Sequence, residues 1–196
     1  MLSFLNYHFI EVSMPNLPIA LTYFRILIIP LFIFIFFIPG DLGNWLCCFT
    51  FVFAGFTDYL DGKLARKYNE ETKLGALLDP IADKIMVSVA LVLLIHSNSI
   101  KDLTLYAAII IISREILVSG LREFLAKSQV SLPVSSLSKV KTFLQMFAIS
   151  VLLSGDPGNE FLLGYGRDIG LSSLWVAASI TVYTGYEYLR TGLKYT

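Results

Sequence analysis

Four aspartates stand close together in a chain that is otherwise rich in apolar residues. Asp58 and Asp61 are three residues apart, and Asp79 and Asp83 are four residues apart. Either spacing puts two side chains on one face of a helix, so two facing helices would bring four carboxylates to one place. Carboxylates grouped this densely repel one another unless a cation holds them together. The stretch therefore predicts a metal site.

The residue types around the aspartates indicate which metal and which chemistry. Ligands that are all oxygen suit Mg²⁺ or Mn²⁺, whereas zinc prefers His or Cys. A pair of such ions about 3.5–4 Å apart recurs in phosphoryl transfer. Gly62 removes a side chain where a ligand must come close, and Arg66 offers a planar guanidinium to a phosphate. Ion pairing of the acids with nearby lysines is the weaker alternative, because charges at membrane depth are costly.

The composition of the whole chain indicates a membrane protein. Of its 196 residues, 56% are hydrophobic and only 15% are charged, and the mean hydropathy is +0.70. Soluble proteins carry about 25% charged residues. The formal net charge is zero, so no overall positive field suggests nucleic acid as a partner.

Six apolar segments come near the roughly 20 residues that a membrane-spanning helix needs. We expect these helices at residues 19–38, 43–58, 74–96, 103–125, 139–154 and 169–186. A loop rich in Gly, Asp and Pro, residues 155–158, is expected to separate the last two. Nothing indicates a strand pair, an internal repeat or a domain linker. The predicted fold class is an all-α integral membrane protein with six transmembrane helices.

One domain is expected to cover residues 19–196. Residues 1–18 are expected to form an N-terminal interfacial segment, and Met14 is an alternative start. This segment lacks the basic residues that begin a cleaved signal peptide, and Glu11 interrupts its apolar stretch.

The basic residues set the expected orientation. Lys and Arg cluster after the second and fourth apolar segments and in the tail after the sixth, whereas the alternate connections hold only Lys101 and Arg167. By the positive-inside rule the basic side is cytoplasmic, with both termini inside. The aspartates and the intramembrane cations then fall in one cytoplasmic half, where we expect a polar active-site cavity. A transporter would instead carry polar groups near the midplane.

The pattern D-x-x-D-G-x-x-A-R, eight residues, then G-x-x-x-D-x-x-x-D resembles the signature of the CDP-alcohol phosphatidyltransferases. Every fixed position of that signature is matched, by Asp58, Asp61, Gly62, Ala65, Arg66, Gly75, Asp79 and Asp83. The six-helix layout is also similar to that family, so the resemblance covers most of the chain.

The resemblance implies a two-metal site and a catalytic base. Asp58, Asp61 and Asp79 would hold one ion, and Asp58, Asp79 and Asp83 would hold a second. The two ions would be Mg²⁺ or Mn²⁺. Asp83 would also act as the general base that deprotonates the acceptor alcohol while CMP leaves.

The resemblance also implies a binding site for the CDP moiety. Asp58, Gly62 and Arg66 would contact it, with Thr72 a further candidate near the pyrophosphate. The donor would be a CDP-linked lipid, CDP-diacylglycerol.

The acceptor is less well defined by the signature than the donor. Segments 15–25, 112–124 and 138–146 resemble bacterial members of the family that make phosphatidylglycerophosphate. Their acceptor, glycerol 3-phosphate, carries a phosphate and calls for a cationic pocket. We expect five residues to form that pocket: Arg25, Arg114, Arg122, Lys139 and Lys141.

Arg114 is expected to face an anionic ligand. The neighbouring Glu115 projects about 100° away around the helix, which makes an ion pair between the two side chains awkward.

The expected function is therefore transfer of the phosphatidyl group from CDP-diacylglycerol to glycerol 3-phosphate in phospholipid biosynthesis. The enzyme would be a multi-pass protein of the cytoplasmic membrane, in contact with membrane lipid. A sister enzyme that uses inositol phosphate, serine or phosphatidylglycerol is the nearest alternative, and a small cation transporter or a non-catalytic membrane scaffold is less favoured. Family members are often homodimers, so the resemblance implies a second copy as one partner.

Overall fold

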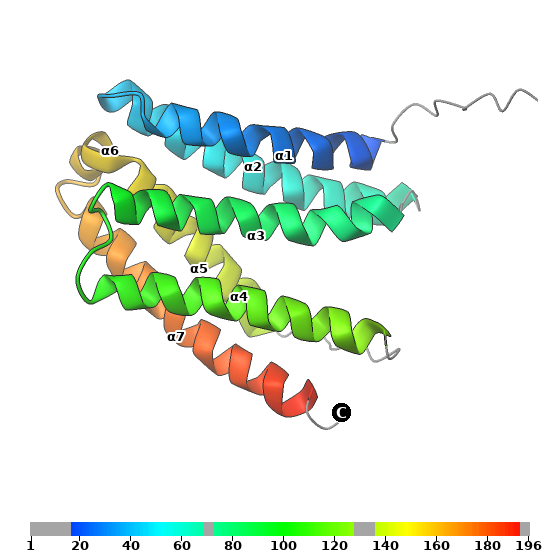
Figure 1. The fold of residues 1–196 in the computed structure, drawn as a ribbon. Coiled ribbons are helices and arrows are strands. Elements are labelled where there is room, and N and C mark those ends of the chain that lie inside the picture. Colours follow the sequence, from blue (N-terminus) through cyan, green and yellow to red (C-terminus); the bar gives the residue numbers. More distant parts are fainter. Residues whose placement is uncertain (1–16, 69–72, 128–135, 193–196) are drawn as a thin grey trace, which may run out of the picture.

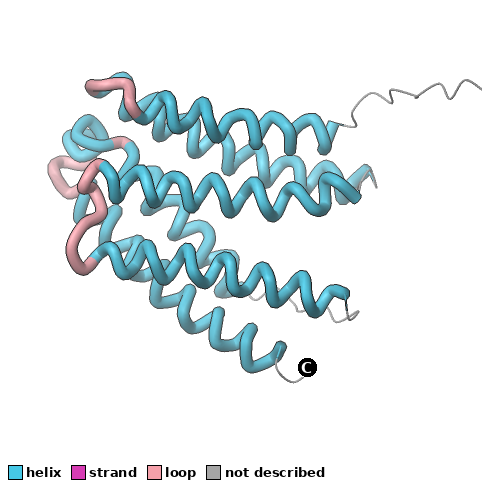
Figure 2. Tube along the Cα trace, in the orientation of Figure 1, coloured by secondary structure: helices cyan, strands magenta, loops and turns pink. Residues whose placement is uncertain are grey.

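The computed structural model of the chain describes residues 17–68, 73–127 and 136–192, and within these ranges every regular element is a helix (Figures 1 and 2). The helices are α1 (Leu17–Phe36), α2 (Asp41–Tyr68), α3 (Lys73–His96), α4 (Thr104–Lys127), α5 (Ser136–Leu153), α6 (Gly155–Phe161) and α7 (Gly166–Gly192). The all-helical prediction is confirmed for these residues.

The second helix is longer than the apolar segment that predicted it. The 28 residues of α2 continue to Tyr68, ten residues beyond Asp58. Lys63 and Lys67 therefore lie on the last turns of α2, and Lys73 begins α3. The prediction that these lysines lie in a connection between helices was wrong. The polar residues continue the helix because Leu, Ala, Arg and Lys are good helix formers even where no apolar run marks them.

Residues 155–158 are not a loop, contrary to prediction. They form the start of the short helix α6. Gly155 takes a positive φ of 56°, which turns the chain sharply after α5, and a Cβ there would meet the Asn44 side chain at 2.6 Å. Pro157 is tolerated because it lies in the first turn of α6, where its missing N–H leaves no bond unmade. The Gly and Pro residues therefore mark the boundary of a helix.

Helix α5 lies at the centre of the packing. It packs most extensively against α7 and also contacts α2, α3 and α6. Small residues allow a close approach between α5 and α7: Ala148 and Ala177 are fully buried, and a Cβ on Gly170 would meet Leu152 at 2.8 Å. Small residues at a helix–helix interface let the backbones approach, as is common in membrane bundles.

Large apolar side chains also cover the outside of the bundle. Leu27 on α1, Ile116 on α4 and Phe143 on α5 are 70%, 63% and 70% exposed. Soluble monomers rarely carry apolar surface this extensive, so it favours contact with lipid. Among the residues described with their side chains, two helices, Thr104–Leu125 and Ser136–Leu153, have the length and composition to cross a membrane, and Leu27–Phe36 and Lys84–His96 are apolar over shorter lengths.

The long helices run roughly along one direction, so their termini gather at two opposite ends of the bundle (Figure 1). At one end, which we call the aspartate end, α2 ends and α3 begins, and α4 and α7 also end there. Helix α5 also begins toward this end. The other end, the loop end, holds the described connections between helices, as Figure 2 shows. The up-down course of the long helices thus brings segments far apart in the sequence to one end.

Candidate functional site

The aspartates are carried by two helices that meet at the aspartate end. Asp58 and Asp61 lie on α2, and Asp79 and Asp83 lie on α3. These two helices contact each other (Figure 1). At these four positions the structure describes the backbone and not the side chains. Among the residues it describes fully, no group of three His, Cys, Asp or Glu could hold a metal ion. The metal site therefore stays a prediction.

Three further predicted site residues, two for the CDP moiety and one for the acceptor, are placed only by their backbone. Gly62 and Arg66 lie on the last turns of α2, near the aspartate end, and Arg25 lies close to the middle of α1. Thr72 lies outside the described residues.

Two contacts join the aspartate-bearing helices to α4 and α5. Lys84, the residue after Asp83, donates a hydrogen bond from Nζ to Ser119 Oγ on α4 at 2.5 Å. On α2, a Cβ added to Gly55 would lie 2.4 Å from Met146 Cε on α5, so the two helices approach closely one turn before Asp58. The neighbourhood of the aspartates is therefore continuous with α4 and α5.

A cluster of charged side chains lies between α4 and α5. Glu115 Oε1 accepts a hydrogen bond from Arg114 Nη1 at 3.4 Å and a second from Lys141 Nζ. Lys141 is only 4% exposed, although lysine side chains are rarely buried. Buried charges need partners of opposite sign. One carboxylate oxygen therefore compensates two cations that come from different helices.

The expectation that Arg114 and Glu115 would not pair was wrong. The Cα–Cβ bonds of neighbouring residues on a helix point about 100° apart, but the Arg114 and Glu115 side chains are both long enough to bend back toward each other. Lys141 on α5 attracts the Glu115 carboxylate toward the bundle interior, because it places a buried ammonium group beside α4. The pairing is thus a product of helix packing.

Arg114 also reaches α7. Its Nη2 donates to Thr184 Oγ1 at 3.0 Å. The adjacent Gly185 leaves room for the side chain to pass, because a Cβ there would lie 3.1 Å from Arg114 Cγ and 3.7 Å from Nε. Arg114 therefore connects α4 to α7 while it contacts Glu115.

Arg122 is held by an aromatic side chain of α7. Its Nη2 donates to the Tyr188 hydroxyl at 2.5 Å, and its Cζ lies 4.7 Å from the centre of the Tyr188 ring. The same ring lies 5.6 Å from Arg114 Cζ. Cations over aromatic faces are attracted by the ring quadrupole. Tyr188 thus lies beside two of the predicted acceptor-site arginines.

The structure brings three of the five predicted acceptor-site cations to one region. We call these three with Glu115 the cationic cluster, which consists of Arg114, Arg122, Lys141 and Glu115. Lys139 is exposed on α5 and is not among the residues that contact Glu115. It precedes Lys141 by two residues and so points about 200° away around the helix.

Sequence reasoning missed the residues that surround these cations. Thr184, Gly185 and Tyr188 lie on one stretch of α7, but they belong to no motif and carry no charge. In the part of the chain described with side chains, three buried polar atoms have no hydrogen-bond partner: Arg114 Nε, Gln145 Oε1 and Thr181 Oγ1. Gln145 lies one turn beyond Lys141 on α5. A buried polar atom without a partner calls for an explanation, such as a ligand.

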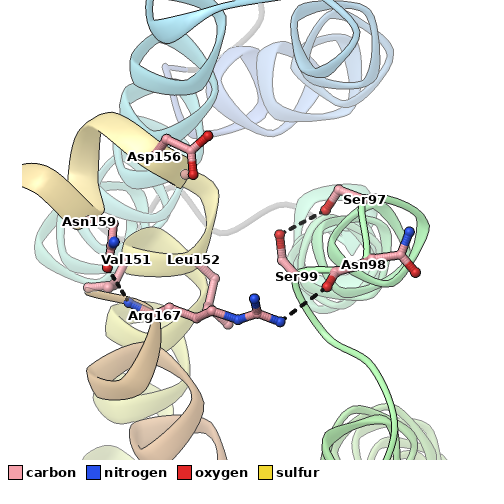
Figure 3. Close-up of a pocket in the computed structure, with 9 residues that line it drawn as sticks. Ser97, Asn98, Ser99, Val151, Leu152, Asp156, Asn159 and Arg167 are labelled. Atoms are coloured by element: carbon pink, nitrogen blue, oxygen red, sulfur yellow. Dashed lines mark hydrogen bonds between the residues drawn. The ribbon is translucent and has the colours of Figure 1, made fainter. Parts of the chain in front are cut away.

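A polar pocket of about 320 Å³ lies at the loop end, away from the cationic cluster (Figure 3). Arg167 of α7 spans it: its backbone N–H donates to Asn159 Oδ1 at 3.2 Å, and its Nη2 donates to the Asn98 carbonyl at 3.4 Å. These bonds join the start of α7 to α6 and to the turn after α3. The polar lining thus serves to connect three elements.

Comparison with known proteins identifies similar sequences over nearly the whole chain. The family profile described as CDP-alcohol phosphatidyltransferase matches residues 15–183. A Rickettsia felis protein named CDP-diacylglycerol–glycerol-3-phosphate 3-phosphatidyltransferase is 45% identical over 180 residues, which are 92% of this chain and 97% of that protein. Proteins with the same name from Pectobacterium atrosepticum and Pseudomonas fluorescens are each 42% identical over 89% of this chain, and the matches cover 93% and 89% of those proteins.

Proposed function

Because the chain belongs to the CDP-alcohol phosphatidyltransferase family, we propose that it transfers the phosphatidyl group of CDP-diacylglycerol to glycerol 3-phosphate. The products are phosphatidylglycerophosphate and CMP. The observation that carries this proposal is the full match of the aspartate motif in a chain 45% identical to a relative with that printed name.

The position of the cationic cluster supports the choice of a phosphorylated acceptor. Lys84, next to Asp83, is bonded to Ser119, which lies one turn beyond Glu115 on α4. Residues four apart share a helix face. Cations that can bind a phosphate therefore lie beside the segment that carries the proposed base. An alcohol without its own negative charge would gain nothing from these cations.

In the proposed reaction, Asp83 accepts the proton of the attacking hydroxyl of glycerol 3-phosphate. The hydroxyl oxygen forms a bond to the phosphorus that carries the diacylglycerol, and the bond from that phosphorus to the CMP oxygen breaks. Gly62 lets the CDP moiety approach the α2 backbone, and Arg66 binds its phosphate. No covalent enzyme intermediate is needed.

Enzymes of this family are generally metal-dependent. The donor set of this chain fits such ions, because four carboxylates suit Mg²⁺ or Mn²⁺. Asp58, Asp61 and Asp79 would hold one ion, and Asp58, Asp79 and Asp83 a second. When bound, two such ions would neutralise the pyrophosphate and stabilise CMP as the leaving group.

We further propose that the protein spans the cytoplasmic membrane with its aspartate end toward the cytoplasm. The 24 residues of α4 extend about 36 Å at 1.5 Å per residue, which exceeds the roughly 30 Å of a hydrocarbon core. The excess of Lys and Arg at the aspartate end supports this orientation. The six-span count and the position of both termini in the cytoplasm belong to the same proposal.

An acceptor panel tests the proposed function. Purified protein with Mg²⁺ and labelled CDP-diacylglycerol is given glycerol 3-phosphate, inositol phosphate, serine or phosphatidylglycerol, and release of CMP is measured. We expect release with glycerol 3-phosphate. Release with inositol phosphate, and none with glycerol 3-phosphate, would assign the chain to a sister enzyme. Absence of CMP release with every acceptor would refute the proposed function.

A further inference from the structure

Glu115 is the one carboxylate that contacts two of the proposed acceptor-site cations in the part of the chain the structure describes. Its Oε1 accepts from Arg114 on α4 and from Lys141 on α5, and the side chains of all three residues are at most 18% exposed. Among the side chains that the structure describes, two cations held by one anion leave one positive charge uncompensated. A cluster with this surplus is suited to a further anion.

Unpartnered atoms in the same region indicate that the cluster is incomplete as it stands. Arg114 Nε has no acceptor, and Gln145 Oε1 has no donor although Gln145 is 3% exposed. Gln145 lies one turn beyond Lys141 and next to Met146, the residue that Gly55 of α2 approaches. A ligand with an anionic group and a hydroxyl carries the two kinds of partner that these atoms lack, because an anion accepts from Arg114 and a hydroxyl donates to Gln145.

We propose that Glu115 is a positioning residue for the acceptor, because it holds the Arg114 guanidinium and the Lys141 ammonium where both can bind the acceptor's phosphate. This inference depends on the proposed function. Without Glu115 the two buried cations would repel each other and their side chains would separate. Glu115 itself contacts the cations and takes no part in the bond-making step.

The shared oxygen makes the length of residue 115 critical. Arg114 Nη1 is already 3.4 Å from Oε1, near the limit for a hydrogen bond. An aspartate at this position would be one methylene shorter and could not contact both cations at once. Glu115→Asp should therefore keep the negative charge but lose the simultaneous contact with Arg114 and Lys141.

The test measures separate Michaelis constants for the two substrates in the full-length protein. In Glu115→Gln and Glu115→Asp we expect the KM for glycerol 3-phosphate to rise about tenfold or more, as fits the loss of a hydrogen bond to a charged group. The KM for CDP-diacylglycerol should stay within about twofold, because the donor is assigned to α2 and α3. Glu160→Gln, at an exposed carboxylate on α6 at the loop end, is the matched control and should change neither KM.

A charge exchange separates positioning from simple stabilisation. The double variant Glu115→Lys with Lys141→Glu restores an ion pair between α4 and α5 but moves the cation to the other helix. We expect its melting temperature to recover relative to Glu115→Lys alone while the KM for glycerol 3-phosphate stays high. Recovery of both quantities would show that Glu115 has only a structural role and would overturn the inference.

The outcomes distinguish this inference from the proposed function. Wild-type protein that releases CMP with glycerol 3-phosphate, together with Glu115→Asp and Glu115→Gln variants whose KM is unchanged, refutes the positioning role alone. Wild-type protein that is inactive with glycerol 3-phosphate but active with an uncharged alcohol refutes the proposed function, and the inference fails with it. If Glu115→Gln does not fold, Glu115→Asp alone decides, because it retains the compensating charge.

Discussion

Substitution of Gly185 by alanine should weaken acceptor binding without unfolding the protein. The new Cβ would lie 3.1 Å from Arg114 Cγ, closer than an ordinary contact of about 3.4–4 Å. The α7 backbone is fixed by its packing on α5 and α4, so the arginine side chain must move by a few tenths of an ångström. That movement extends the 3.4 Å bond to Glu115, which is already the longest in the cluster.

The size of the effect can be worked out from the hydrogen bond that the displaced Arg114 guanidinium would no longer donate to the acceptor's phosphate. A hydrogen bond to a charged group contributes about 1.5–3 kcal/mol. Loss of about 1.5 kcal/mol corresponds to roughly a tenfold higher KM for glycerol 3-phosphate. Stability should change in the opposite direction, because alanine in a helix interior is favoured over glycine by about 0.5–1 kcal/mol. The variant should therefore melt at or above the wild-type temperature while it binds the acceptor more weakly.

The assay is CMP release at saturating CDP-diacylglycerol with varied glycerol 3-phosphate, beside a thermal melt in the same detergent. Gly120→Ala is the control, because a Cβ at Gly120 on α4 meets nothing within 4 Å. The reasoning is refuted if Gly185→Ala leaves this KM unchanged, or if Gly120→Ala raises it equally. A lower melting temperature for Gly185→Ala would also contradict it, because it would mean that the new methyl group displaces the α7 backbone and not the Arg114 side chain.

Four further outcomes test other parts of the site. Asp83→Asn should lower kcat by about 10²-fold or more while binding of CDP-diacylglycerol persists, as expected for a lost general base, and equal loss of binding would argue against that role. Chelation of divalent cations should abolish CMP release, and added Mg²⁺ or Mn²⁺ should restore it; activity that survives chelation would exclude the metal proposal. Tyr188→Phe removes the acceptor of the Arg122 bond but keeps the ring, so the KM for glycerol 3-phosphate should rise only a few-fold, and an unchanged KM would place Arg122 outside the acceptor site. Arg167→Ala at the loop end should lower the melting temperature by about 2–4 °C for each kcal/mol of unfolding free energy that is lost, and both KM values should stay unchanged. A changed KM for either substrate would show that the loop-end pocket affects substrate binding.

The sequence predicted the helices well where apolar residues mark them and less well where polar residues continue them. The segments 74–96 and 103–125 agree closely with α3 and α4. Helix α2 was predicted to end near Asp58 because its last turns have no apolar run, yet they remain helical. Residues 155–158 carry the Gly and Pro residues of a loop, but those residues suit the first turn of α6 as well. Local composition cannot tell a loop from the first turn of a helix at these residues, because the outcome depends on how α6 packs against α2, α5 and α7.

The sequence by itself determined the chemistry of this protein, and only the tertiary structure decided how its cations are arranged. The spacing of Asp58, Asp61, Asp79 and Asp83 is a local property of two helices, so the order of residues alone was enough to identify the family and to predict a metal site. The grouping of Arg114 with Glu115, Lys141 and the α7 residues around Gly185 depends on how three helices distant in sequence pack together. No spacing along the chain encodes that contact, because the residues that shape it are 26 to 70 positions apart.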